Sequence, residues 1–178
     1  AHADPSANLP PVMVALKAQL VAARRGGERR TIPADEFFLD AFTTALEPDR
    51  EMLVEVRLPP WPPGSGGTYM KLSKREIDFS IVEVAAQMSV DGDGRVKESR
   101  VVLGSVATRP YRATAAENVL SGSVVDDALA AKAAEAGTKD LEPPSDVQAS
   151  SWYRKEVAKV LVKRAILRAW KRARGVEQ

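Results

Sequence analysis

The side chains that could carry out chemistry in this chain are few. One histidine, His2, and no cysteine occur among the 178 residues. A Ser-His-Asp triad would therefore rest on the second residue of the chain, and cysteine nucleophiles, disulfides and thiolate-ligated zinc or iron–sulfur sites are excluded within it. Neither a Gly-x-Ser-x-Gly motif nor a P-loop is present. The acidic residues are scattered, with no pattern that pairs two of them in a cleft. The sequence does not indicate a self-contained enzyme.

Two glycine-containing motifs have a binding interpretation and a structural one. Residues 24–30, Arg-Arg-Gly-Gly-Glu-Arg-Arg, could suggest phosphate binding, but glycines between apolar runs favour a hairpin turn exposed to solvent. Residues 91–94, Asp-Gly-Asp-Gly, resemble part of a calcium loop. They lack the twelve-residue ligand set and its closing glutamate, so they too predict a hairpin turn.

The strongest charge asymmetry lies near the C-terminus. Residues 152–174 hold nine Lys or Arg and one acid, Glu156, so the rest of the chain, with 17 basic and 23 acidic residues, has a balance of −6. A nucleic-acid-binding helix is one interpretation of this segment, with Arg154 among the cations that would track phosphates. Apolar residues at helical spacing between Val157 and Trp170 instead predict a helix packed on a core.

The rest of the sequence predicts helices and strands before and after a proline- and glycine-rich segment at 59–67. Residues 12–20 predict a helix or a helix running into a strand, and 33–38 a helical turn whose phenylalanines are buried. Residues 52–58 alternate, which predicts a half-buried strand with Met52, Val54, Val56 and Leu58 inside and Leu53 on the polar face. Proline and glycine at 59–67 predict a boundary. Beyond it we expect a hairpin of 81–90 with 95–103, short helices at 111–121 and 124–136, and a long helix at 152–173. No apolar run is long enough to span a bilayer.

Several segments, in order, resemble a known family. They are Ala1-His2-Ala3-Asp4-Pro5, Thr44-Ala45-Leu46-Glu47-Pro48, the strand from Leu53 to Pro59, Tyr69-Met70-Lys71 with Asp78-Phe79, and the end of the last helix. This ordered set is similar to the FAD-binding medium subunit of the molybdenum hydroxylases, the family of xanthine dehydrogenase and aerobic carbon monoxide dehydrogenase, without its N-terminal part. The resemblance implies an α+β fold. Residues 1–60 would be the second half of a PCMH-type FAD-binding domain, 61–67 a linker, and 68–178 a flavoprotein C-terminal domain with a small antiparallel sheet covered by helices.

The resemblance also implies site residues. Asp4 matches the turn that follows the glycines at the FAD pyrophosphate, with His2 beside it. Asn8 stands where the family commonly has an aspartate that contacts the nucleotide, and an asparagine keeps an acceptor but loses the charge. Leu53 matches a residue of the flavin pocket. Lys71 matches a lysine near the isoalloxazine edge, where a cation can stabilise the reduced flavin.

The function implied by the resemblance is electron transfer. Electrons would pass from a molybdenum cofactor through [2Fe-2S] centres, both on partner subunits, to FAD and then to an external acceptor, within a dimer of heterotrimers in the cytoplasm. Nucleic acid and membrane insertion are not expected. Two alternatives remain: a flavin-free remnant that keeps the subunit contacts, and a nucleic-acid-binding module that uses the basic helix.

Overall fold

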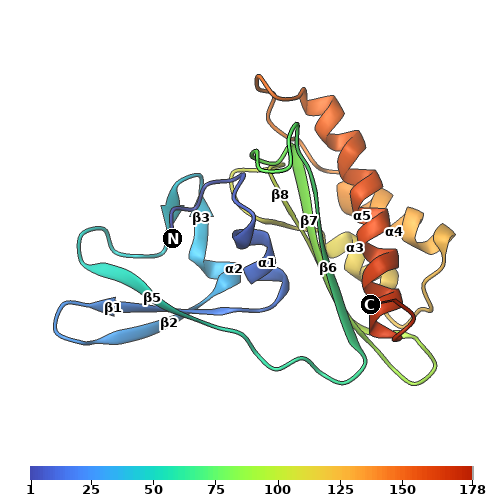
Figure 1. The fold of residues 1–178 in the computed structure, drawn as a ribbon, viewed down its shortest axis with the longest axis horizontal. Helices are drawn as coiled ribbons and strands as arrows, with labels where there is room; N and C mark the ends of the chain where they lie inside the picture. Colours follow the sequence, from blue (N-terminus) through green and yellow to red (C-terminus); the bar gives the residue numbers. More distant parts are fainter. Residues whose placement is uncertain (178) are drawn as a thin grey trace.

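The computed structural model describes residues 1–177 and shows two parts that pack side by side (Figure 1). The first part contains two short helices, a three-stranded antiparallel sheet in the order β2-β1-β5, and a small β3-β4 pair. Its elements are α1 (Leu9–Ala15), β1 (Gln19–Arg24), β2 (Arg29–Pro33), α2 (Ala34–Phe37), β3 (Phe38–Asp40), β4 (Thr43–Thr44) and β5 (Glu51–Arg57).

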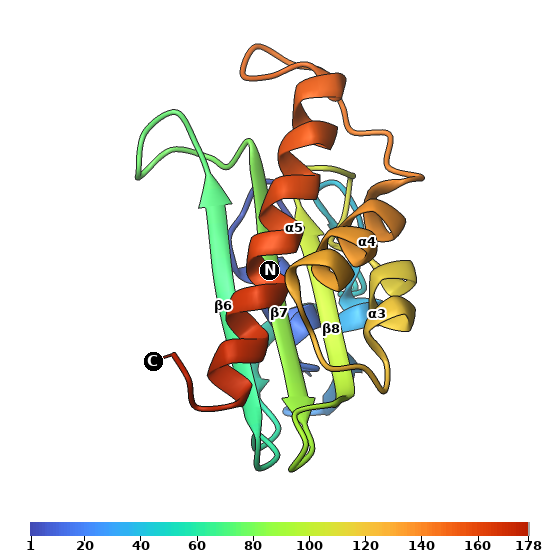
Figure 2. The ribbon, with the colours of Figure 1, turned by 90° about the vertical axis from the view of Figure 1, so that its right-hand side faces the viewer.

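The second part is a four-stranded antiparallel sheet in the order β6-β7-β8-β9, followed by helices. Its elements are β6 (Ser65–Leu72), β7 (Val82–Val90), β8 (Val96–Gly104), β9 (Tyr111–Arg112), α3 (Thr114–Leu120), α4 (Asp127–Thr138) and α5 (Ser151–Ala173). Figure 2 shows α3, α4 and α5 covering one face of this sheet. The α+β fold class is confirmed.

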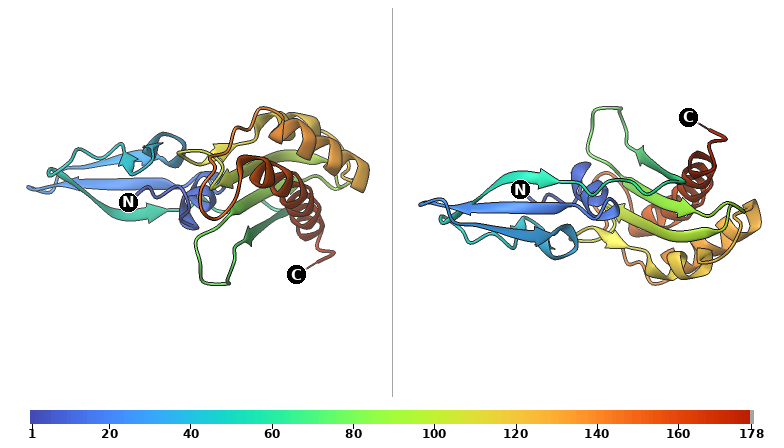
Figure 3. Two further views of the ribbon diagram at one scale, coloured as in Figure 1. Left: turned by 90° about the horizontal axis from the view of Figure 1, so that it is seen from above. Right: turned by 90° about the horizontal axis from the view of Figure 1, so that it is seen from below.

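The opposite face of the same sheet receives the first part of the chain. Helix α1 packs on β7 and β8, and the core of the first part includes Ala85 and Val102 from these strands. The main core lies on the other face, between the sheet and the helices. Because side chains alternate along a strand, one sheet serves both cores. Figure 3 shows the β1–β2–β5 sheet extending away from this junction as an arm.

Several predicted elements are confirmed at the residue level. The 91–94 turn joins β7 and β8, the 24–30 segment joins β1 and β2, and the C-terminal helix runs over Ser151–Ala173. Phe37 and Phe38 are buried and stack edge to face, with ring centroids 5.1 Å apart. The predicted helix at 111–121 begins later, at Thr114, because Tyr111 and Arg112 pair with β8 as a short strand.

The prediction for the faces of β5 was wrong. Met52, Val54 and Val56 are 69%, 46% and 44% exposed, whereas Leu53 packs against the core of the first part. Alternation correctly predicted a strand, but it cannot tell which face is covered when both carry apolar residues. Beside this outer face, Met52 and Val54 help to line a depression of about 470 Å³.

Candidate functional site

The segment before α1 is fixed on the sheet of the second part. Asp4 Oδ1 accepts a hydrogen bond from the Ser6 backbone N–H at 2.8 Å, which forms the expected turn. The Pro5 carbonyl accepts from the Ser105 N–H at 2.9 Å, and the Ser6 carbonyl accepts from the Ser80 hydroxyl at 3.3 Å. These bonds place residues 4–8 over the ends of β7 and β8.

A carboxyl group is buried directly beneath this segment. Glu83 is 0% exposed, although it lies in β7 among apolar neighbours. Its side chain occupies space that a side chain at Gly104 would need, since a Cβ there would lie 2.2 Å from Glu83 Oε1. Among the described residues, Oε1 has no hydrogen-bond partner. A buried carboxyl oxygen without a partner is costly when ionised, so this environment favours the protonated group.

Tyr69 connects the buried carboxyl group to the surface. Its hydroxyl oxygen lies 2.5 Å from Glu83 Oε2 and 2.9 Å from Asn8 Oδ1. Burial is the main cause that raises the pKa of Tyr69, and the neighbouring Glu83 carboxylate raises it further. The phenol therefore remains protonated, and its hydroxyl has a single hydrogen for two oxygen neighbours.

Lys71 lies beside the same carboxyl group. Lys71 in β6 is the direct cross-strand partner of Glu83 in β7, so both side chains lie on the same face of the sheet. The Lys71 ammonium donates to the Asp78 carbonyl at 3.2 Å, which holds the loop between β6 and β7. That loop and the N-terminal segment line a cavity of about 250 Å³, formed by Ser6, Ala7, Asn8, Ile77, Asp78 and Phe79.

The charges around Glu83 set its proton affinity. Burial raises the pKa of Glu83 to about 7, and the Asp4 carboxylate adds to the rise. The Tyr69 and Ser80 hydroxyls and the Lys71 ammonium act in the opposite direction. The carboxyl group thus titrates near neutral pH, where functional acids and bases are commonly found.

The structure brings three of the five predicted site residues together. Asp4 and Lys71 lie near Glu83, and Asn8 is connected to it through Tyr69, whereas His2 and Leu53 lie apart from it. His2 is exposed, with its ring edge against Phe42 at 5.7 Å between centroids. Leu53 pairs with Ala22 of β1. Tyr69 and Glu83 were not predicted as site residues, and the available signal was a single charged residue, Glu83, inside a mostly apolar strand.

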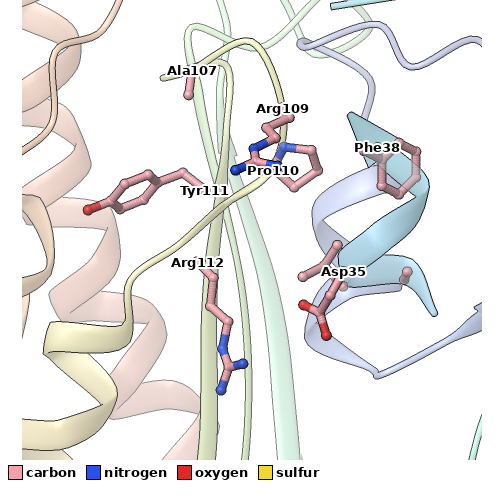
Figure 4. Close-up of a pocket in the computed structure, with 9 residues that line it drawn as sticks. Asp35, Phe38, Ala107, Arg109, Pro110, Tyr111 and Arg112 are labelled. Carbon is pink, nitrogen blue, oxygen red and sulfur yellow. The ribbon is translucent and has the colours of Figure 1, made fainter. Parts of the chain in front are cut away.

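A second cavity, of about 330 Å³, lies at the seam between the two parts (Figure 4). Asp35 faces Arg109 and Arg112 across it, while Tyr111 points toward the helices. Its charges are largely paired: Arg100 contacts Asp35 at 2.7 Å, and Arg112 contacts Glu117 at 2.7 Å. This arrangement holds α1 and α2 against the sheet.

The basic helix packs as the apolar spacing predicted. Ala158, Val162 and Ile166 of α5 are fully buried against the sheet. Arg154, one of the cations proposed to track phosphates, is 2% exposed and donates to the carbonyls of Ile81 and Ser105 and to Asp146. Arg154 is therefore a structural residue. The interpretation in which it contacts nucleic-acid phosphates was wrong for this residue.

No helix in residues 1–177 has both the length and the apolar character to cross a bilayer. Within the same residues, no three His, Asp or Glu side chains are grouped so that they could hold a metal ion.

Family models match both parts of the chain. Residues 1–61 match the FAD-binding domain in molybdopterin dehydrogenase, and residues 67–169 match the CO dehydrogenase flavoprotein C-terminal domain. The chain belongs to the flavoprotein subunit family of the molybdopterin dehydrogenases. The resemblance inferred from the sequence is confirmed.

Curated relatives and solved structures agree with these matches. The 6-hydroxypseudooxynicotine dehydrogenase complex subunit alpha of Paenarthrobacter nicotinovorans is 34% identical over 100% of this chain and 60% of that protein. The carbon monoxide dehydrogenase medium chain of Hydrogenophaga pseudoflava is 33% identical over 97% of this chain and 59% of the relative.

The structure of carbon monoxide dehydrogenase from Hydrogenophaga pseudoflava has a TM-score of 0.89 at 36% identity, over 96% of this chain and 58% of that one. Quinoline 2-oxidoreductase from Pseudomonas putida 86 has a TM-score of 0.87, also at 36% identity. The match covers 100% of this chain and 60% of that one. The chain thus spans about 60% of the length of the relatives it matches.

The residues present fit one part of an FAD molecule. The cavity at Asn8 offers an amide, and Lys71 supplies a half-buried cation beside it. The volume of this cavity, about 250 Å³, is small for a complete dinucleotide, because ligand pockets usually measure about 300–1,000 Å³. No glycine occurs in residues 1–25, so this segment offers no glycine-rich turn for a pyrophosphate.

Proposed function

We propose that this chain is the second portion of an FAD-carrying electron-transfer subunit in a molybdenum hydroxylase complex. Electrons would come from the molybdenum cofactor of a large subunit, pass through [2Fe-2S] centres of an iron–sulfur small subunit, and leave through FAD to an external acceptor. The complex would be a dimer of heterotrimers. The observation that carries the proposal is the cavity at the junction of the two family domains. Asn8 reaches it from one domain, and the loop held by Lys71 reaches it from the other.

The roles of the site residues follow from their positions. Flavin, when bound, supplies the redox chemistry. Asp4 shapes the turn, and Asn8 offers hydrogen bonds to the nucleotide. Lys71 places a positive charge at the edge of the cavity, where it favours a more negative ligand. His2 and Leu53 would contact the cofactor farther from this cavity, on the side of the first part.

Replacing Lys71 tests this assignment in the complete subunit. We expect Lys71→Ala to make the flavin midpoint potential more negative by ~30 mV, equivalent to about 1.4 kcal/mol for a two-electron couple. FAD content should stay near the wild-type value, because the lost charge acts on the ring and not on the phosphates. Spectroelectrochemical titration and flavin quantification measure the two quantities.

Two variants serve as controls. Lys74→Ala removes a neighbouring exposed cation, whose ammonium contacts the Val147 carbonyl, and should leave the potential unchanged. Lys71→Arg keeps the charge and should restore most of the potential. Loss of flavin at an unchanged potential in Lys71→Ala would make the lysine a binding residue. A complete wild-type subunit that binds no FAD would favour the flavin-free remnant.

A further inference from the structure

The two hydrogen bonds of Tyr69 cannot both be made while Glu83 is ionised. Its hydroxyl carries one hydrogen and lies within hydrogen-bond distance of Glu83 Oε2 and Asn8 Oδ1. An ionised Glu83 and an Asn8 carbonyl oxygen are both acceptors, so one of them would face the phenol without a hydrogen.

Two arrangements satisfy all three groups. When Glu83 is protonated, its O–H donates to the Tyr69 oxygen, and Tyr69 donates to Asn8 Oδ1. When Glu83 is ionised, Tyr69 donates to the carboxylate instead. Asn8 then has to turn its amide so that Nδ2 donates to the Tyr69 oxygen. Asn8 is exposed, so solvent can take up the displaced bond in either state.

We propose that the proton on Glu83 determines, through the single hydroxyl hydrogen of Tyr69, which end of the Asn8 amide faces the cavity. With Glu83 protonated, Asn8 presents its N–H donors to the cavity, which suits an acceptor such as a phosphate or carbonyl oxygen. With Glu83 ionised, Asn8 presents its carbonyl oxygen, which suits a hydroxyl donor. The proton exchanges with solvent, and the Tyr69 hydroxyl only rotates.

The surroundings of Glu83 support such a change near neutral pH. Lys71 and Tyr69 reach it from β6, Asp4 from the N-terminal segment, and Ser80 from the loop before β7, and Gly104 of β8 lies against it. Lys71 favours the carboxylate and Asp4 opposes it, whereas burial favours the protonated form. The switch concerns this chain alone, and it rests on the proposed function only for the identity of the ligand in the cavity.

NMR on the flavin-free 178-residue chain tests the switch directly. The side-chain carboxyl carbon of Glu83 and the side-chain NH₂ group of Asn8 are followed from pH 5 to 9. We expect both to titrate with one midpoint near 7. In Tyr69→Phe the Asn8 signals should lose this titration. In Glu83→Gln, whose amide donates to Tyr69 as the protonated acid does, Asn8 should remain in its low-pH state.

Tyr153→Phe is the matched control, because Tyr153 is an exposed tyrosine on α5. In this variant the Glu83 and Asn8 signals should titrate as they do in the wild type. A Glu83 that does not titrate between pH 5 and 9 would overturn the switch. The switch would also be overturned if the Asn8 signals did not change with the titration of Glu83, or if they still changed with it in Tyr69→Phe. Backbone amide spectra show whether each variant is folded. Failure of the complete subunit to bind FAD would refute the proposed function and leave these measurements standing.

Discussion

Glu83 shows how much a single side chain can depend on its surroundings. An acid near the start of the buried strand β7 is tolerated because Tyr69 provides a partner and Gly104 provides the space. Lys71 on the adjacent strand offsets part of the cost of the negative charge. Any one of these neighbours would be unremarkable in another context, but together they hold a titratable group within the structure.

The raised pKa of Glu83 makes stability depend on pH. Its ordinary value of 4.5 applies to the unfolded chain and about 7 to the folded one, so the folded state binds the proton more tightly. This contribution is complete below pH 4.5 and is lost as the pH rises through 7. Relative to Glu83→Gln, we expect the wild type to lose about 3 kcal/mol of unfolding free energy across that range.

Urea denaturation of both proteins between pH 4 and 8 measures this difference. Glu36→Gln changes an exposed glutamate of α2 and should give a pH profile parallel to that of the wild type. Parallel profiles for Glu83→Gln and the wild type would show that the pKa of Glu83 is the same in the folded and the unfolded chain.

At the scale of elements, the contact between α5 and β6 is unusually close. A Cβ at Gly66 in β6 would lie 2.2 Å from the Ala173 nitrogen and 2.5 Å from the Ala169 carbonyl oxygen. Strand and helix backbones therefore meet directly at the C-terminal end of α5. The Arg172 guanidinium donates to the Gly67 carbonyl at 2.9 Å at the same end.

This contact predicts that Gly66→Ala forces the end of α5 away from the sheet. We expect a loss of about 1–3 kcal/mol, the usual cost of overpacking a core. Thermal denaturation followed by circular dichroism measures it. Gly92→Ala, in the β7–β8 turn, has open space around the added methyl group and should be close to neutral. Equal melting temperatures for both variants would contradict the backbone contact.

Local signals explain which elements could be predicted from the sequence. The Asp-Gly turn between two β-rich runs fixed the β7–β8 hairpin, and the helical spacing of Val162 and Ile166 placed α5 on a core. The faces of β5 depend on which segments lie beside it, so alternation alone could not assign them. Arg154 contacts Ser105, and Tyr69 contacts Asn8. Both contacts connect residues far apart in the sequence, so no local pattern could predict them.

At the scale of the whole molecule, the two family domains are joined by a shared core as well as by a linker. The N-terminal segment and α1 lie on the face of the sheet opposite the helices, and Ala85 and Val102 belong to the core of the first part. The candidate flavin cavity forms along this joint.

The arrangement predicts that the 178-residue chain alone retains no FAD. Pyrophosphate binding by backbone N–H groups needs a close approach that glycine-rich turns allow, and residues 1–25 contain no glycine. After incubation with FAD and gel filtration, the protein fraction should lack absorbance near 450 nm, whereas the complete subunit should keep it. A stoichiometric flavin spectrum from this chain would refute the expectation.

The outer strand β5 also affects how the isolated chain behaves in solution. It pairs only with β1 among the described strands, so one row of its backbone N–H and C=O groups is open, beside the exposed side chains of Met52, Val54 and Val56. Edge strands of this kind are templates for aggregation. The ion pair between Glu55 and Arg57, at 2.8 Å, places charge on the other face of the strand and leaves the apolar face unprotected. Recombinant preparations of this chain should therefore lose monomer as concentration rises.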